Sequence, residues 1–228
     1  MLLKTPHKTS LAAFAIALTA GLLYAGTASQ AALIEDFEDA NADSRATIVS
    51  FADPGFGSTG VNVARVTAFG NGPSAAGSHN LRFTANADNS GNFGTAVMEF
   101  SFVDPWDFTN ASPATIDTLI SDANENEFNN ITIDILDSSG NVLASTSALP
   151  DDRRDWQTFT FPAISSNDVA GLRTTVQRFG SASNNDRLRV HLDNFIAEGA
   201  VIIPEPGALG LLACGGLLML SRRRRSIV

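Results

Sequence analysis

The amino-acid sequence predicts an all-β chain, folded as an antiparallel β-sandwich or barrel, between two apolar end segments. Three observations predict this fold class: short runs in which apolar and polar residues alternate, polar turn-forming clusters every 8–15 residues, and the lack of a long amphipathic helical pattern in the middle of the chain. The 228 residues divide by composition into three parts, 1–31, 32–199 and 200–228.

Alternating runs mark the strands of the middle region. In each run the apolar residues recur at every second position between mostly polar ones, which is the period of a half-buried strand. The runs contain Leu81 and Phe83; Met98, Phe100 and Phe102; Ile131, Ile133 and Ile135; Phe159 and Phe161; Leu188, Val190 and Leu192. Residues 137–141, Asp-Ser-Ser-Gly-Asn, predict a tight hairpin turn, because glycine adopts positive φ without steric cost.

The first 31 residues predict a secretory signal peptide. Lys4 and Lys8 form a short positive region, and residues 11–23 follow without a charge. Ser29 and Ala31 place small residues at the −3 and −1 positions, so cleavage is expected after Ala31. An uncleaved N-terminal anchor is the alternative.

The last 29 residues predict one short transmembrane helix. Pro204, Glu205 and Pro206 precede an apolar run over residues 207–220, and prolines do not fit a helix interior, so the helix starts after them. Four arginines follow and hold that end on the cytoplasmic side, which places residues 32–199 outside. Fourteen helical residues reach about 21 Å, less than the roughly 30 Å of a hydrocarbon core. Such a span suits a temporary tether. The arginines are Arg222, Arg223, Arg224 and Arg225.

The order Pro204-Glu205-Pro206, apolar helix and arginine cluster resembles a PEP-CTERM sorting signal. The resemblance implies recognition and cleavage by an exosortase in a Gram-negative bacterium that makes extracellular polysaccharide. It implies export by the Sec machinery, transient tethering to the inner membrane, and final placement at the cell surface or outside the cell. A plain tail anchor with a chance Pro-Glu-Pro is the alternative.

The composition of residues 32–199 excludes several classes of protein. This region carries 23 Asp and Glu against 9 Arg and no Lys, and so strongly acidic a surface repels nucleic acid. The single cysteine, Cys214, lies in the tail, so the exported region has no disulfide.

Four segments of the middle region resemble the jelly-roll sandwiches of carbohydrate-binding modules and related galactose-binding-like domains. They are residues 33–39, 104–108, 155–161 and 189–195, together with the hairpin over residues 131–142. The resemblance implies that the first and last strands lie near each other, and that a structural calcium ion sits at an edge of the sandwich.

Calcium and a sugar are the candidate ligands. Calcium prefers hard oxygen ligands. Asp36 and Glu38 are expected on one face of the first strand, and the resemblance brings Asp193 of the last strand nearby; ordinary solvated carboxylates are the alternative. A sugar ring stacks on an aromatic side chain. Trp156 has the opposite strand parity to Phe159 and Phe161, so it could face outward as a platform, or else plug the end of the core.

No nucleophile motif appears, and the middle region contains two histidines, His79 and His191, so we do not expect an enzyme. The sequence thus predicts an exported, exosortase-sorted surface or matrix protein with a non-catalytic binding or structural sandwich. A true carbohydrate-binding module for the host's exopolysaccharide is one alternative, and a glycan hydrolase with an unrecognised carboxylate pair is the other.

Overall fold

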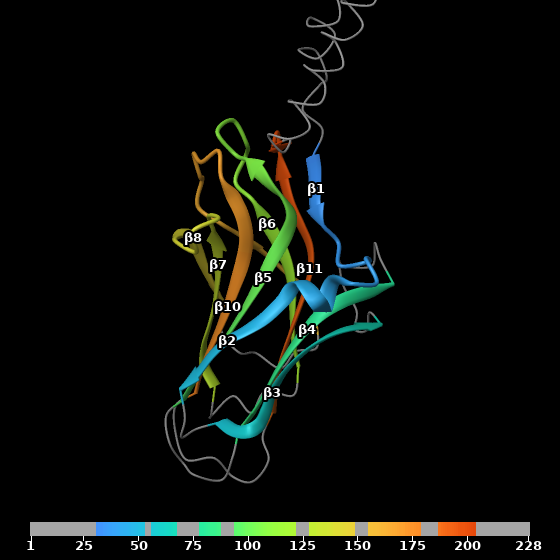
Figure 1. Cartoon of the computed structure of the whole chain (residues 1–228), viewed down its shortest axis with the longest axis vertical. Helices are drawn as coiled ribbons and strands as arrows, with labels where there is room; N and C mark the ends of the chain where they lie inside the picture. The colour runs from blue at the N-terminus through green and yellow to red at the C-terminus, as the bar shows by residue number, and fades with distance from the viewer. Residues whose placement is uncertain are drawn as a thin grey trace, which may run out of the picture. The chain divides into compact units, whose positions relative to one another are not determined.

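The described part of the chain is a sandwich of two antiparallel β-sheets (Figure 1). The structure, a computed structural model, describes residues 31–52, 56–67, 78–87, 94–121, 128–148, 155–178 and 187–203, which belong to one compact unit starting at Ala31. Six strands form each sheet. The all-β, antiparallel sandwich predicted from the sequence is therefore confirmed.

The first sheet, sheet A, has the strand order β3-β4-β11-β6-β9, and β1 also pairs with β11. Its strands are β1 (Ala31–Glu35), β3 (Phe56–Thr67), β4 (His79–Ala87), β6 (Thr115–Ser121), β9 (Gln157–Thr160) and β11 (Arg187–Glu198). The long β11 is central, because it pairs with β4 and β1 on one side and with β6 on the other.

The second sheet, sheet B, has the strand order β12-β5-β10-β7-β8, and β2 also pairs with β5. Its strands are β2 (Ala46–Ala52), β5 (Gly94–Asp107), β7 (Phe128–Leu136), β8 (Val142–Ala148), β10 (Val169–Arg178) and β12 (Val201–Ile202). A 3-10 helix, η1 (Ala42–Arg45), precedes β2. The close approach of β10 to β5 requires a glycine, because a Cβ on Gly171 would overlap the carbonyl oxygen of Phe100.

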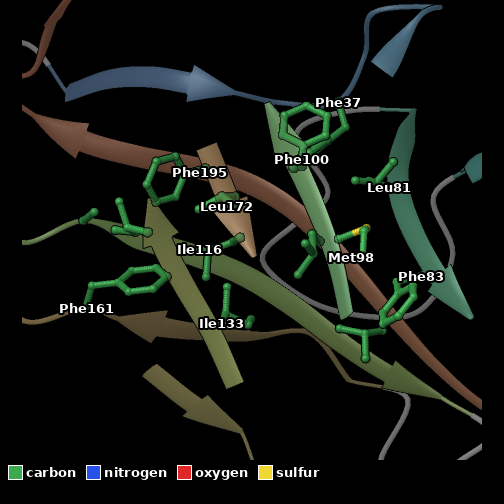
Figure 2. Packing of buried hydrophobic residues seen from close by; sticks show 14 of the residues in the cluster. Phe37, Leu81, Phe83, Met98, Phe100, Ile116, Ile133, Phe161, Leu172 and Phe195 are labelled. Carbon is green, nitrogen blue, oxygen red and sulfur yellow. The ribbon is translucent and has the colours of Figure 1, made fainter. Parts of the chain in front are cut away.

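The core fills the space between the two sheets with the apolar residues of the alternating runs (Figure 2). Phe195 of β11 is its aromatic centre, since its ring stacks on Phe102 at 5.5 Å and meets the edge of Phe161 at 6.0 Å. The predicted inward positions are confirmed, with Phe159 partly buried at the margin. The other members of the runs are fully or nearly fully buried: Leu81, Phe83, Met98, Phe100, Phe102, Ile131, Ile133, Ile135, Phe161, Leu188, Val190 and Leu192.

The predicted hairpin turn joins β7 to β8. Gly140 has a φ of +79° and donates its N–H to the Asp137 carbonyl at 3.0 Å. The Asp137 carboxylate accepts the N–H groups of Ser139 and Asn141 at 2.9 and 2.8 Å. Residues 137–141 thus make the hydrogen bonds of the turn among themselves, which is why this hairpin could be predicted without tertiary information.

The first strand and the strand that ends the predicted domain lie side by side, as the jelly-roll resemblance implied. β1 pairs with β11 from Ala31↔Glu198 to Glu35↔Phe195. The sandwich continues to β12, which lies beyond the expected boundary at 199. The predicted signal peptide up to Gln30 and the segment from Pro204 to Val228 lie outside the described residues. In the described ranges, no helix is long and apolar enough to cross a membrane.

Candidate functional site

The outer face of sheet A is polar, yet much of it is buried. Side chains alternate along a strand. Since Leu188, Val190 and Leu192 face the core, the residues between them on β11 face outward, together with their partners on β4 and β6. We call these residues the sheet A outer face: Asn80, Arg82 and Thr84 of β4; Asp117, Leu119 and Ser121 of β6; Arg189, His191 and Asp193 of β11. Asn80 and Asp193 are 0% exposed and His191 is 1% exposed, which is unusual for polar residues on an outward-facing surface.

His191 lies at the centre of this face and is held from both sides. Its Nδ1 lies 2.9 Å from Asn80 Oδ1, and its Nε2 lies 3.4 Å from Ser121 Oγ. Burial, followed by the positive charges of Arg82 and Arg189, lowers the pKa of His191 to about 3. The imidazole is therefore neutral at ordinary pH, so one ring nitrogen donates a hydrogen bond and the other accepts one.

Two aspartates face each other beside His191. Asp193 of β11 lies directly opposite Asp117 of β6 in the register, and a β-bulge follows Asp193. Asn194, with a φ of +44°, lies in this bulge and bonds to both: its N–H donates to Asp193 Oδ1 at 2.8 Å, and its Nδ2 donates to Asp117 Oδ2 at 3.1 Å. Thr158 of β9 donates to the other oxygen of Asp117 at 2.5 Å. The bulge thus re-aims a side chain onto the outer face.

Some side-chain atoms of this face are buried without a hydrogen-bond partner in the described part of the chain. Asn80 Nδ2 and Thr84 Oγ1, both on β4, have no hydrogen-bond partner within the described ranges of the chain. An unpaired buried polar group costs about 1–3 kcal/mol. Both atoms are buried, so an added group would reach them only if the side chains that cover them moved.

Trp156 lies on the outward side of sheet A, next to His191. β9 follows it, and within β9 the register places Thr158 opposite the outward Asp117. The Trp156 ring meets the edge of His191 with centroids 6.3 Å apart, and Trp156 does not belong to the core cluster between the sheets. The ring is 6% exposed, so it is packed against its neighbours on this face. Its role in ligand binding stays a prediction.

The expected placement of the calcium ligands differs from the structure. β1 ends at Glu35, so Asp36 and Glu38 lie in the turn that follows, where the backbone reverses at Phe37 with a φ of +55°. The expectation that they share a face of the first strand is therefore wrong. Asp193 lies on the sheet A outer face. Among the described residues, no three His, Cys, Asp or Glu side chains are grouped so that they could hold a metal ion.

The oxygens of this turn already have donors. Arg65 of β3 donates from Nε to the Phe37 carbonyl at 3.0 Å and from Nη2 to the Glu38 carbonyl at 2.6 Å. The Glu38 carboxylate accepts the N–H groups of Ser78 and His79 and the Ser78 hydroxyl. Burial raises the pKa of Glu38, but these hydrogen bonds outweigh it and lower the pKa below its ordinary value. The Arg65 guanidinium thus binds the oxygens that a calcium ion would need as ligands. The residues of this turn therefore do not fit a calcium site.

The residues that organise the sheet A outer face and the turn after β1 were not predicted from the sequence. Asn80 and His191 are 111 positions apart, and Arg65 is 28 positions from Phe37, so no local motif joins them. One signal was present: Arg189, His191 and Asp193 occupy the polar positions of an alternating run, which places them on one face of a strand.

No model of a known protein family matches the chain, and no curated protein matches it. Solved structures resemble its fold. The family 11 carbohydrate-binding module from Clostridium thermocellum, in complex with a β-1,3-1,4-mixed-linked tetrasaccharide, is 14% identical over 76% of this chain and 98% of that chain, with a TM-score of 0.43. The carbohydrate-binding module TmCBM27, studied for specific mannan recognition, is 9% identical over 75% and 99%, with a TM-score of 0.43. An arabinose-bound α-L-arabinofuranosidase, MgGH51, is 16% identical over 75% of this chain and 26% of its own, also at 0.43. The similarity is one of β-sandwich fold.

Proposed function

We propose that this chain is a non-catalytic β-sandwich that binds polysaccharide through the sheet A outer face. It is exported, sorted by an exosortase through Pro204-Glu205-Pro206 and the arginine cluster, and displayed at the cell surface or in the extracellular matrix. The sorting part rests on the sequence resemblance, and the binding part rests on the geometry of sheet A.

The observation that supports the binding proposal is the set of hydrogen-bonding side chains on the sheet A outer face, of which Arg82 and Arg189 are partly exposed. Asn80 Nδ2 and Thr84 Oγ1 are buried beside a face that has hydrogen-bonding side chains on three neighbouring strands. A saccharide presents many hydroxyl and ether oxygens, which the partly exposed Arg82 and Arg189 of this face can contact. Trp156 and Leu119 are buried beneath the same face, at 6% and 0% exposed, so they support its shape.

The test is binding of the purified chain to a glycan array and to the polysaccharide of the producing bacterium, with and without Ca²⁺. We expect specific binding that Trp156→Phe weakens several-fold. Trp106→Phe is the matched control, because Trp106 lies in β5 of the other sheet and should leave the affinity unchanged. A folded protein that binds no glycan in either assay would refute the binding role and leave a structural matrix role.

One observation favours the hydrolase alternative. Asp117 and Asp193 are directly opposed in neighbouring strands, which brings Cβ atoms to about 4.5–5.5 Å, and retaining glycosidases use closely spaced carboxyl pairs. Both carboxylates accept hydrogen bonds from within the sheet, which suits a structural role. Release of reducing ends from exopolysaccharide, abolished by Asp117→Asn, would establish the hydrolase instead.

A further inference from the structure

We propose that one end of the sandwich rests on a zwitterionic lipid surface while the chain is tethered, and that Val103, Val201 and Ile202 are the side chains that contact the lipid. This end, which we call the β12 pole, is formed by the start of β1, the end of β5, and β12. The inference rests on the proposed sorting function, in which the tail is a temporary tether. It deepens that function because it states which surface of the folded protein meets the membrane.

Both ends of the described sandwich lie at this pole. Ala31, the first described residue, pairs with Glu198 at the end of β11, and Ile203, the last described residue, donates its N–H to the Pro105 carbonyl at 3.0 Å. The start of β1 and the ends of β5 and β11 lie together at the upper end of the sandwich in Figure 1. The two segments that the sequence predicts to enter a membrane therefore join the sandwich at the same end.

Strand β12 presents apolar side chains to solvent at this pole. Val201 pairs with Asp107 and Ile202 pairs with Trp106, yet the two side chains of β12 are 62% and 47% exposed. Transfer of exposed apolar surface out of water is favourable. The residues that directly precede the predicted tail are therefore suited to an apolar contact.

Val103 adds a third apolar side chain on the neighbouring strand. It is 74% exposed, which is the highest value among the exposed large apolar residues of the described ranges. Strand β5 bulges here, because it has four residues between Ser101 and Trp106 where β10 has only Ala170. Bulges redirect side chains, and this one lies next to the residues of β5 that pair with β12.

The chain between the sandwich and the predicted membrane helix is too short to hold the β12 pole away from lipid. The apolar run starts at Gly207, and the four steps from Ile203 to Gly207 reach at most about 14 Å. The predicted helix, at about 21 Å, is shorter than a hydrocarbon core of roughly 30 Å, so it draws this linker towards the membrane. The tether thus supplies a high local concentration, which lets a small apolar surface stay in contact.

The charges around the pole select the kind of lipid. Asp104 and Asp107 of β5 are partly exposed, and Glu198 of β11 is exposed. Anionic headgroups repel carboxylates that lie within a Debye length, about 8 Å at physiological ionic strength. The pole therefore suits a zwitterionic surface, such as one rich in phosphatidylethanolamine.

The test measures contact between single sites and lipid. The chain with its tail is reconstituted in vesicles of phosphatidylethanolamine and phosphatidylcholine, after Cys214→Ala removes the only cysteine of the sequence. A fluorescent dye on Val103→Cys or Val201→Cys should be quenched by nitroxide-labelled lipid at least threefold more than the same dye on Val49→Cys. Val49 is the matched control, because it is also an exposed valine of sheet B, at 52%, but lies beside the first half of β5.

Extraction of the vesicles with alkaline carbonate separates the inference from the function on which it rests. We expect the chain to resist extraction. A chain that resists it, but is quenched no more at Val103 and Val201 than at Val49, would overturn the lipid contact and leave the tether standing. A chain that carbonate removes would refute the tether and the contact together. Disulfides between Val201→Cys copies without lipid quenching would assign the pole to a second copy of the chain instead. Thermal unfolding of each variant checks the fold, and substitutions at these exposed positions should leave the melting temperature unchanged.

Discussion

His191 is the residue through which pH should most affect stability. Its folded pKa is about 3, whereas an exposed histidine titrates near 6.5. The charged groups that face it are Arg82 on β4, Arg189 and Asp193 on β11, and Asp117 on β6. Below pH 6.5 the unfolded state binds a proton on His191 that the folded state does not bind. His191 therefore leaves the stability unchanged above pH 6.5 and lowers it as pH drops from 6.5 towards 3.

The slope of this loss should approach about 1.4 kcal/mol per pH unit. Urea unfolding between pH 7 and pH 5 measures it before the carboxylates titrate, and the His191→Gln variant should show a flatter profile. A parent profile as flat as that of the variant would show that His191 is protonated in the folded protein.

Gly171 tests the packing of β10 on β5 at the level of one atom. A Cβ there would overlap the backbone oxygen of Phe100, which cannot rotate away as a side chain could. We expect Gly171→Ala to lower the free energy of unfolding by about 1–3 kcal/mol. Gly140→Ala has open space around it but a φ of +79°, so it should cost about 1 kcal/mol from backbone strain alone. Equal costs for the two variants would contradict the packing argument.

The turn after β1 is an element held by an arginine from another strand. Arg65→Ala removes both hydrogen bonds to the carbonyl groups of Phe37 and Glu38, and we expect it to cost about 2 kcal/mol. Arg65→Lys should recover only part of this, because a single ammonium lacks the planar fork that reaches two carbonyls. Calorimetry measures both variants.

The same element decides the calcium question. Because Arg65 lies against the oxygens of the turn, the melting temperature of the parent should not change when Ca²⁺ is replaced by EDTA. In Arg65→Ala those oxygens lose their cation, so added Ca²⁺ should raise the melting temperature of this variant. A clear rise for the parent protein would instead restore the metal site predicted from Asp36, Glu38 and Asp193.

At the scale of the whole molecule, the sequence allowed the sheets to be predicted but not the site. The Ile131, Ile133 and Ile135 run and the turn at Gly140 carry their own periodicity and turn chemistry, and both are confirmed. Asn80, Ser121 and His191 meet because β4, β6 and β11 are neighbours in sheet A, and strand order is a tertiary property that no local pattern contains.

The order of the strands also bears on processing at the two ends. Every strand that the structure describes lies between Ala31 and Ile202, and cleavage after Ala31 would remove only the first residue of β1 and leave the pairs Ala32↔Ala197 and Leu33↔Ile196. Removal of residues 1–31 and of the arginine cluster would therefore leave the core intact, and the processed protein should unfold at the same temperature as the precursor. Intact-mass spectrometry of protein from cells with and without the sorting enzyme measures the ends. We expect a chain that begins at Ala32 in both strains and lacks Arg222 to Arg225 only where the enzyme is present. Arginines retained in both strains would rule out sorting, while an unchanged melting temperature would still support a sandwich that is complete without its two tails.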